Sequence, residues 1–234
     1  MYPGTMNLAS ELPAAETSAA WADQPVYAWL LIAAALLVLF LLPELFKLIP
    51  SVSGCLIRSR GNLEVEHSIS TARSRNQCAR ILLVPFVLAV SRYGLYTPAF
   101  LADWGHPWLQ LGQILAVCAA YLILRRILHA LLLNIRSLRL DYEDRRAITR
   151  GILNFFVLLM LGLLPTVCLL YAFGAGDSAA RAVLLTEIAL AWGFSVTREA
   201  QFLHSKCSGL GTFLYLCGLE FIPAACLVFS GICL

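Results

Sequence analysis

The chain has 234 residues, of which 60% are hydrophobic and only 13% are charged. Soluble domains are about 45–50% apolar and about 25% charged, so this composition excludes an ordinary soluble protein and indicates that much of the chain is solvated by lipid. The net charge of +3 is too small to indicate a nucleic-acid partner, and the positions of the basic residues are more informative than their number.

The chain begins with a polar segment, residues 1–25, that contains no Lys or Arg. The apolar run that follows is too long for the core of a cleaved signal peptide. We therefore expect residues 1–25 to form a mobile tail on the outer side of a membrane, and residues 26–234 to form a single transmembrane domain.

Six segments are candidates for transmembrane helices, each of which needs about 20 mainly apolar residues. The second is interrupted by Pro85 and Arg92, and the fifth is short and carries Glu187 at its middle. The sequence predicts an all-α integral membrane protein, a six-helix transmembrane bundle with helices at about 26–49, 79–97, 108–133, 151–173, 179–196 and 210–234.

The basic residues predict the orientation of this bundle. All 17 Lys and Arg residues except Arg92 and Arg181 lie in, or at the helix ends beside, the three loops on one side. Short loops rich in Lys and Arg remain in the cytoplasm, so we expect both termini outside. Arg125 and Arg126 lie near the cytoplasmic end of their helix, and we expect them to extend toward that interface.

Two of the cytoplasmic segments, 51–78 and 134–150, are too polar to span and too short to form domains. Each could form a short interfacial helix whose arginines contact anionic lipid head groups, or could simply carry charges that set the topology. The candidate head-group contacts are Arg58, Arg60, Arg73, Arg75, Arg145 and Arg146.

Two acidic residues lie inside predicted transmembrane helices, Glu187 and Glu220. From the expected helix ends, both lie about 14–15 Å into the bilayer, near its midplane. Each shares a helix face with small residues, which mark close helix packing in membranes. We expect this buried ionisable pair to share an interior site, with Arg92 as a candidate charge partner.

A proline follows Glu220 by three residues and leaves the Leu219 carbonyl without a helical partner. A broken helix beside a carboxylate is typical of ion sites in transporters. The pair could bind a proton or an ion, or could simply hold two helices together through a hydrogen bond.

No nucleophile, metal-ligand or phosphate-loop motif occurs, so the sequence predicts no catalytic residue, no metal and no cofactor. The eight cysteines contain no C-x-x-C pair, and most lie in apolar runs where Cys acts as a small hydrophobic residue. The expected partners are membrane lipids, with other membrane proteins as a further candidate. No nucleic-acid partner is expected.

The final segment contains YLCGLEFIP, and its matching positions are Tyr215, Leu216, Cys217, Leu219, Glu220 and Pro223. This segment resembles the YLC-x-LE-x-x-P final helix of an uncharacterised family of multi-spanning inner-membrane proteins of Bacteroidetes, a domain of unknown function. The resemblance implies an all-helical bundle in the bacterial inner membrane and implies no activity.

These observations favour a non-enzymatic membrane protein, transporter-like or a component of envelope assembly, with a polar centre at Glu187 and Glu220. Two alternatives remain: an intramembrane enzyme that acts on a lipid, and a structural subunit of a larger membrane complex.

Overall fold

The computed structural model describes residues 25–58, 61–96, 107–133, 142–207 and 209–233. Every regular element within these ranges is a helix, as predicted. The elements are α2 (Pro25–Ile57), α3 (Gly61–His67), α4 (Ile69–Arg92), α6 (Pro107–Leu133), α7 (Tyr142–Ala172), α8 (Asp177–Lys206), α9 (Gly209–Leu216), the π-helix η1 (Cys217–Phe221) and α10 (Ile222–Cys233). The predicted tail, residues 1–25, lies outside the described residues except for Pro25.

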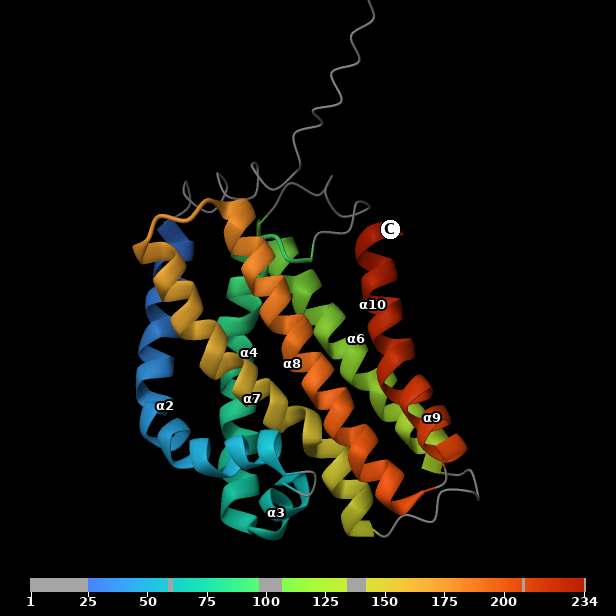
Figure 1. Cartoon of the computed structure of the whole chain (residues 1–234). Coiled ribbons are helices and arrows are strands. Elements are labelled where there is room, and N and C mark those ends of the chain that lie inside the picture. The colour runs from blue at the N-terminus through green and yellow to red at the C-terminus, as the bar shows by residue number, and fades with distance from the viewer. Residues whose placement is uncertain (1–24, 59–60, 97–106, 134–141, 208, 234) are drawn as a thin grey trace, which may run out of the picture.

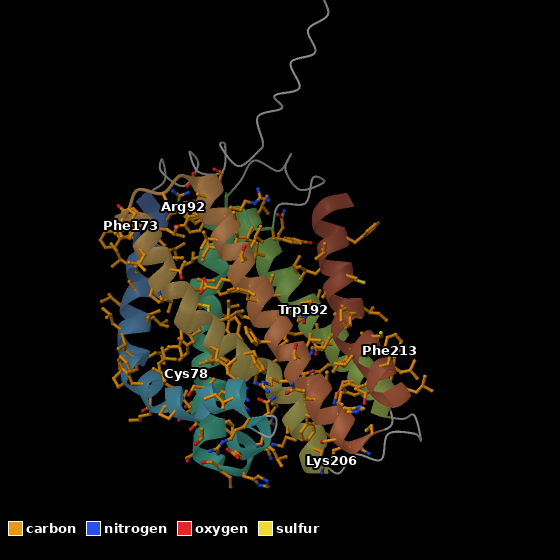
Figure 2. The ribbon with its side chains drawn as sticks, in the orientation of Figure 1. Cys78, Arg92, Phe173, Trp192, Lys206 and Phe213 are labelled. Atoms are coloured by element: carbon orange, nitrogen blue, oxygen red, sulfur yellow. The ribbon has the colours of Figure 1, made fainter. Side chains whose placement is uncertain are left out.

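The long helices run side by side and alternate in direction along the chain (Figure 1). The start of α2 and the end of α10 lie at the same end of the bundle, at the top of Figure 1. Figure 2 gives landmarks for both ends: Arg92 and Phe173 lie at the top, Lys206 lies at the bottom, and Trp192 lies between them. We call the end that contains Lys206 the basic end.

Five stretches of the described residues are long and apolar enough to cross a membrane: Tyr27–Ile57, Leu111–Leu131, Asp144–Ala172, Asp177–Lys206 and Gly209–Phe229. Large apolar side chains on their outer surfaces are exposed, for example Phe40 at 85% and Tyr171 at 85%. A surface of this kind is stable in lipid rather than in water, so the described helices indicate a membrane-embedded protein.

The second predicted span corresponds to α4, which does not meet the same standard of length and apolarity. Its first half carries Arg73, Arg75 and Arg80, and only its second half is continuously apolar. It begins ten residues before the predicted start at Ala79 and ends five residues before the predicted end at Thr97. Five of the six predicted spans are therefore candidate membrane spans in the described residues, and the remaining one, α4, is not.

The helices α7 and α8 also extend beyond their predicted ends, and both extensions are at the basic end. The fourth span was predicted to begin at Gly151, whereas α7 begins at Tyr142. The fifth was predicted to end at Val196, whereas α8 continues for ten more residues to Lys206. Hydropathy marks where a helix leaves the apolar core, whereas the backbone hydrogen bonds of the helix continue past that point.

The segment between the first two spans is also largely helical. The helix α2 continues past Pro50 to Ile57, and the short helix α3 packs against its last turns. A Cβ atom at Gly61 would lie 2.6 Å from the Cα of Cys55 and 2.7 Å from the carbonyl oxygen of Gly54. Only glycine therefore allows the two backbones to approach this closely.

The largest apolar core lies between α2, α4 and α7. It contains the buried side chains Leu41, Leu45, Leu48, Val52, Cys78, Ala79, Leu82, Val157 and Met160. A second core lies toward the basic end, where Ile148 of α7 meets Phe202 and Leu203 of α8 and Tyr215 and Leu219 of the final helix. This second core surrounds the candidate site.

Candidate functional site: a buried arginine with two carboxylates

Three helices bring one arginine and two glutamates together inside the bundle. Arg125 of α6 is 5% exposed, Glu199 of α8 is 1% exposed and Glu220 of η1 is fully buried. The Nε atom of Arg125 donates to Oε1 of Glu220 over 3.1 Å, and its Nη2 atom donates to the same oxygen. The same Nη2 atom donates to Oε1 of Glu199 over 3.4 Å. We call these three residues the Arg125 cluster.

The backbone completes the surroundings of the guanidinium group. Nη1 of Arg125 donates to the carbonyl oxygen of Thr149 in α7 over 3.3 Å. All three guanidinium nitrogens therefore have acceptors, which is the condition for burying an arginine.

In contrast to the guanidinium group, each of the two carboxylates is hydrogen-bonded to described residues at only one of its oxygens. The Oε2 atoms of Glu199 and of Glu220 receive no hydrogen bond from the residues that the structure describes. The two carboxyl groups nevertheless lie close together, because their Oε1 atoms accept from the same Nη2 atom of Arg125. Two ionised carboxylates have no proton to donate to each other, whereas one proton bound by the pair would supply such a donor.

The π-helical turn orients Glu220. In η1 the backbone N–H of Ile222 donates to the carbonyl oxygen of Cys217, five residues back. Pro223 follows directly and cannot donate, so the regular α-helical ladder is interrupted here. The wider turn places Leu219 and Glu220 on the buried side next to each other. Single π-helical turns of this kind are frequently found at functional sites.

Glu199 is a site residue that the sequence analysis did not identify. The predicted fifth helix ended at Val196, so Glu199 was assigned to a cytoplasmic loop. The signal that could have located it is the helical spacing of Ser195, Glu199, Phe202 and Leu203, which are all buried.

Arg125 was expected to extend toward the cytoplasmic interface, and that expectation is wrong because the side chain is buried among three helices. Its neighbour Arg126 is exposed. Consecutive residues of a helix point about 100° apart, so one of two adjacent arginines can face the interior while the other faces out. The presence of two acids deep in the bundle decides which one is buried.

The structure corrects the predicted pairing of Glu187 with Glu220. Glu187 lies twelve residues before Glu199 on α8, which is about 18 Å along the helix axis. It contacts α7 instead, where Thr166 Oγ1 donates to its Oε1 over 3.5 Å and Gly162 leaves room for the carboxyl group. The prediction of equal depth depended on a fifth helix ending at Val196, which is ten residues too early.

The predicted charge partner Arg92 contacts neither of these acids in the structure. It lies at the opposite end of the bundle, 3.7 Å from Asp177 at the start of α8, in a partly exposed ion pair (Figure 2). The position of Arg92 at the last residue of α4 places it near the membrane surface rather than at the midplane.

A second buried polar group lies at the basic end around Glu66 of α3. Its carboxylate pairs with Arg75 of α4, with Arg146 of α7 over 2.9 Å and with Arg150 of α7 over 3.5 Å. Arg75 also donates to the side chain of Asn154 over 3.1 Å. Burial lowers the pKa of Arg75 and the Glu66 carboxylate opposes this effect. The guanidinium remains charged, because arginine is not deprotonated in proteins.

The predicted head-group arginines therefore have different environments. Arg75 is fully buried, which contradicts its proposed contact with lipid. Arg58 and Arg73 are exposed and Arg145 and Arg146 are half-buried, so these four can reach an interface. Arg60 lies outside the described residues.

A small cavity links the two polar groups. Asn62 accepts a hydrogen bond from Asn154 of the Glu66 group over 2.9 Å. Asn62 and Glu199 also line a cavity of about 10 Å³. The remaining lining residues are Ala147, Ile148 and Phe202. This volume is close to the minimum of about 10–15 Å³ that one water molecule needs.

Within the described residues, no three His, Cys, Asp or Glu side chains gather where they could hold a metal ion. Comparisons with protein-family models, with curated proteins and with solved structures gave no match. The chemistry of the site is therefore argued from its own residues.

Proposed function

We propose that this chain is a non-enzymatic, multi-pass protein of the bacterial inner membrane, transporter-like, whose Arg125 cluster binds and releases a proton. The inner membrane is inferred from the resemblance of YLCGLEFIP to the Bacteroidetes family. The proposal includes six crossings with both termini outside, supported by the alternating helix directions and by the basic residues that gather at one end.

One observation carries this proposal: two fully buried carboxyl groups share a single arginine. A purely structural ion pair is complete with one acid. A second ionised acid would leave the buried cluster with a net charge of −1 in a medium where uncompensated charge is costly. One proton on the carboxyl pair restores neutrality, and its loss would create the charge that coupling to transport requires.

The cavity beside Glu199 supports a route for this proton. A water molecule in the cavity would contact Glu199 and Asn62, and Asn62 belongs to the polar group at the basic end. The proton would then reach the Arg125 cluster from the side that we assign to the cytoplasm.

Infrared difference spectroscopy of the purified protein in lipid nanodiscs tests the proposal. A protonated buried carboxyl group has a carbonyl stretch distinct from that of a carboxylate. We expect a pH titration of the wild-type protein to show one such band appearing and disappearing, and we expect Glu199→Gln and Glu220→Gln each to remove it. Glu44→Gln is the matched control, because Glu44 is exposed and pairs with Lys47 outside the cluster.

Two outcomes would contradict the proposal. A wild-type spectrum without a titrating buried carboxyl group would mean that the cluster holds no exchangeable proton. A band that persists in both cluster variants would assign the proton to another residue, such as Glu187, and would leave the Arg125 cluster with a structural role.

A further inference from the structure

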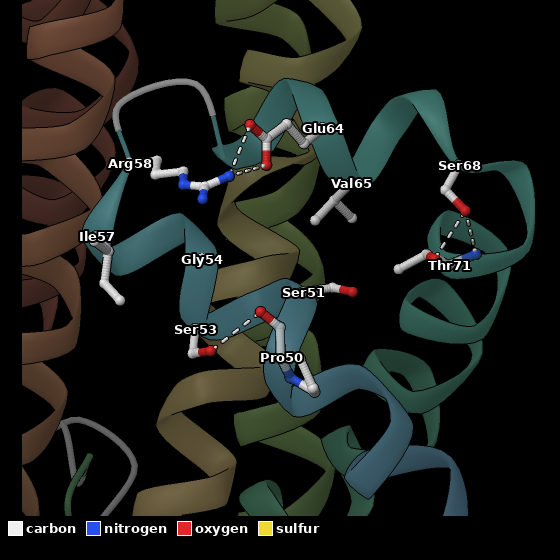
Figure 3. Close-up of a pocket in the computed structure, with 10 residues that line it drawn as sticks. All are labelled: Pro50, Ser51, Ser53, Gly54, Ile57, Arg58, Glu64, Val65, Ser68 and Thr71. Carbon is white, nitrogen blue, oxygen red and sulfur yellow. Dashed lines mark hydrogen bonds and ion pairs between the residues drawn. The ribbon is translucent and has the colours of Figure 1, made fainter.

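A groove of about 360 Å³ opens at the basic end, away from the Arg125 cluster. It lies between the last turns of α2, the helix α3 and the first turn of α4 (Figure 3). This volume falls within the range of about 300–1,000 Å³ that is typical of small-molecule sites. The groove is therefore large enough for a ligand, and its lining indicates which one.

The charged residues of the groove are one cation and one anion. Nη1 of Arg58 lies 3.4 Å from Oε2 of Glu64, and the two side chains are 69% and 57% exposed. Figure 3 shows this pair together at one side of the groove. A long ion pair that is open to solvent is weak, so either partner can be exchanged for a ligand group at little cost. The net charge of zero fits a zwitterionic ligand better than an anion.

The remaining polar groups of the groove are hydroxyls. Ser68 Oγ caps α4 by accepting from the Thr71 backbone N–H and from Thr71 Oγ1, on the side opposite to Arg58 in Figure 3. Ser53 Oγ donates to the carbonyl oxygen of Pro50, and Ser51 is a third serine in the lining. Hydroxyl groups both donate and accept, so they suit the phosphate oxygens and the ammonium protons of one ligand.

The edges of the groove are apolar. Ile57 in the lining is 77% exposed, and Pro50 and Val65 are the other large apolar residues that line the groove. The spanning helix α2 leads directly to the groove. A bound head group would therefore sit where its acyl chains can continue along an apolar surface, which favours a lipid over a water-soluble molecule.

We propose that this groove binds the phosphoethanolamine head group of a membrane lipid, with the phosphate at Arg58 and the primary ammonium at Glu64. Phosphate accepts charge-assisted hydrogen bonds from a guanidinium group, and a primary ammonium donates them to a carboxylate. A choline head group has no N–H to donate, and a glycerol head group leaves Glu64 without a cation. The groove thus distinguishes ethanolamine from both. The inference is independent of the proton site.

Native mass spectrometry of the full chain in detergent tests this inference with three lipids that carry the same acyl chains. We expect phosphatidylethanolamine to be retained about tenfold better than phosphatidylcholine or phosphatidylglycerol, the effect of one charge-assisted hydrogen bond. Glu64→Gln should remove this preference while some binding of phosphatidylglycerol remains. Arg58→Gln should weaken the binding of all three lipids.

The chain offers a matched control in Glu44 and Lys47, an exposed ion pair on α2 that does not line the groove. Glu44→Gln and Lys47→Gln should retain the lipids as the wild type does. Equal retention of the three lipids by the wild type, or groove variants that behave like these controls, would overturn the proposal. Soluble glycerophosphoethanolamine should compete poorly, and competition as strong as that of the lipid would overturn the assignment to a membrane lipid.

Discussion

Arg125 is the one cation in the buried cluster, and its neighbour Arg126 is exposed to the surroundings of the bundle. Removing the first leaves Glu199 and Glu220 without a counter-charge. We expect Arg125→Gln to destabilise the protein by about 3–5 kcal/mol, the usual cost of breaking a buried ion pair by removing one partner. Thermal unfolding in detergent, followed by tryptophan fluorescence, measures this effect as a lower Tm.

Arg126→Gln is the control, because it removes the same charge from the next position of the same helix. Its Tm should remain close to that of the wild type, since exposed charges contribute little to stability. If the two variants unfold at the same temperature, Arg125 does not carry the energetic role that its contacts indicate.

Of the three residues of the Arg125 cluster, the sequence allowed only Glu220 to be predicted as a buried site residue. Glu220 stood out because it interrupts an otherwise apolar segment, and the cost of burying a carboxyl group requires a partner. The identity of that partner could not be predicted, because Arg125 lies 95 residues before Glu220 and 74 residues before Glu199 in the chain. The spacing of residues along a helix determines which of them share a face, whereas contacts between helices depend on how the helices pack.

At the scale of elements, the contact between α3 and the end of α2 depends on Gly61. A Cβ at this position would overlap backbone atoms of Cys55 and Gly54, which cannot move aside as a flexible side chain can. We expect Gly61→Ala to displace α3 and to cost about 1–3 kcal/mol, the usual range for overpacking. It should also weaken lipid retention by the groove, because α3 supplies Glu64.

Gly54→Ala provides the comparison. A Cβ at Gly54 meets nothing within 4 Å, and the position lies inside α2, where Ala is favoured over Gly by up to about 1 kcal/mol. We expect this variant to unfold at the same or a higher temperature than the wild type, in the thermal assay used for Arg125. A lower Tm for Gly54→Ala than for Gly61→Ala would contradict the close backbone approach.

The helical nature of each predicted span was correct, because long apolar segments in lipid must satisfy their backbone hydrogen bonds internally. The ends of α7 and α8 were wrong by nine and ten residues, because polar turns continue a helix without an apolar signal. The π-helical turn at Cys217–Phe221 was not predicted. Pro223 indicated an interruption but did not determine its form.

At the scale of the whole molecule, the crossing of α4 decides the topology. Six crossings place the N-terminus and the C-terminus of the chain on the same side of the membrane, whereas five crossings place them on opposite sides. We expect alkaline phosphatase fused after Ala102 or after Leu234 to be active, and green fluorescent protein fused at the same positions not to fluoresce. Fusions after Lys206 should show the reverse, because green fluorescent protein becomes fluorescent only in the cytoplasm.

These fusions separate two models. If α4 does not cross, the green fluorescent protein fused after Ala102 fluoresces. The fusion after Leu234 then lies outside only if the helices after α4 keep their orientation. Composition and the distribution of basic residues predicted the membrane class and this orientation. They could not establish the crossing of α4, because its arginines Arg73, Arg75 and Arg80 lower its hydropathy whether they face lipid or protein.

The polar links at the basic end affect how the bundle can move. Toward the basic end, ion pairs and hydrogen bonds tie several helices together: Glu66 to Arg146, Arg198 to the Leu56 carbonyl, and Lys206 to Asp144. Toward the other end, Arg92 pairs with Asp177 over 3.7 Å and Thr166 donates to Glu187 over 3.5 Å. The links at the basic end join α3 to α7, α2 to α8 and α7 to α8, so the helices there resist separation from one another.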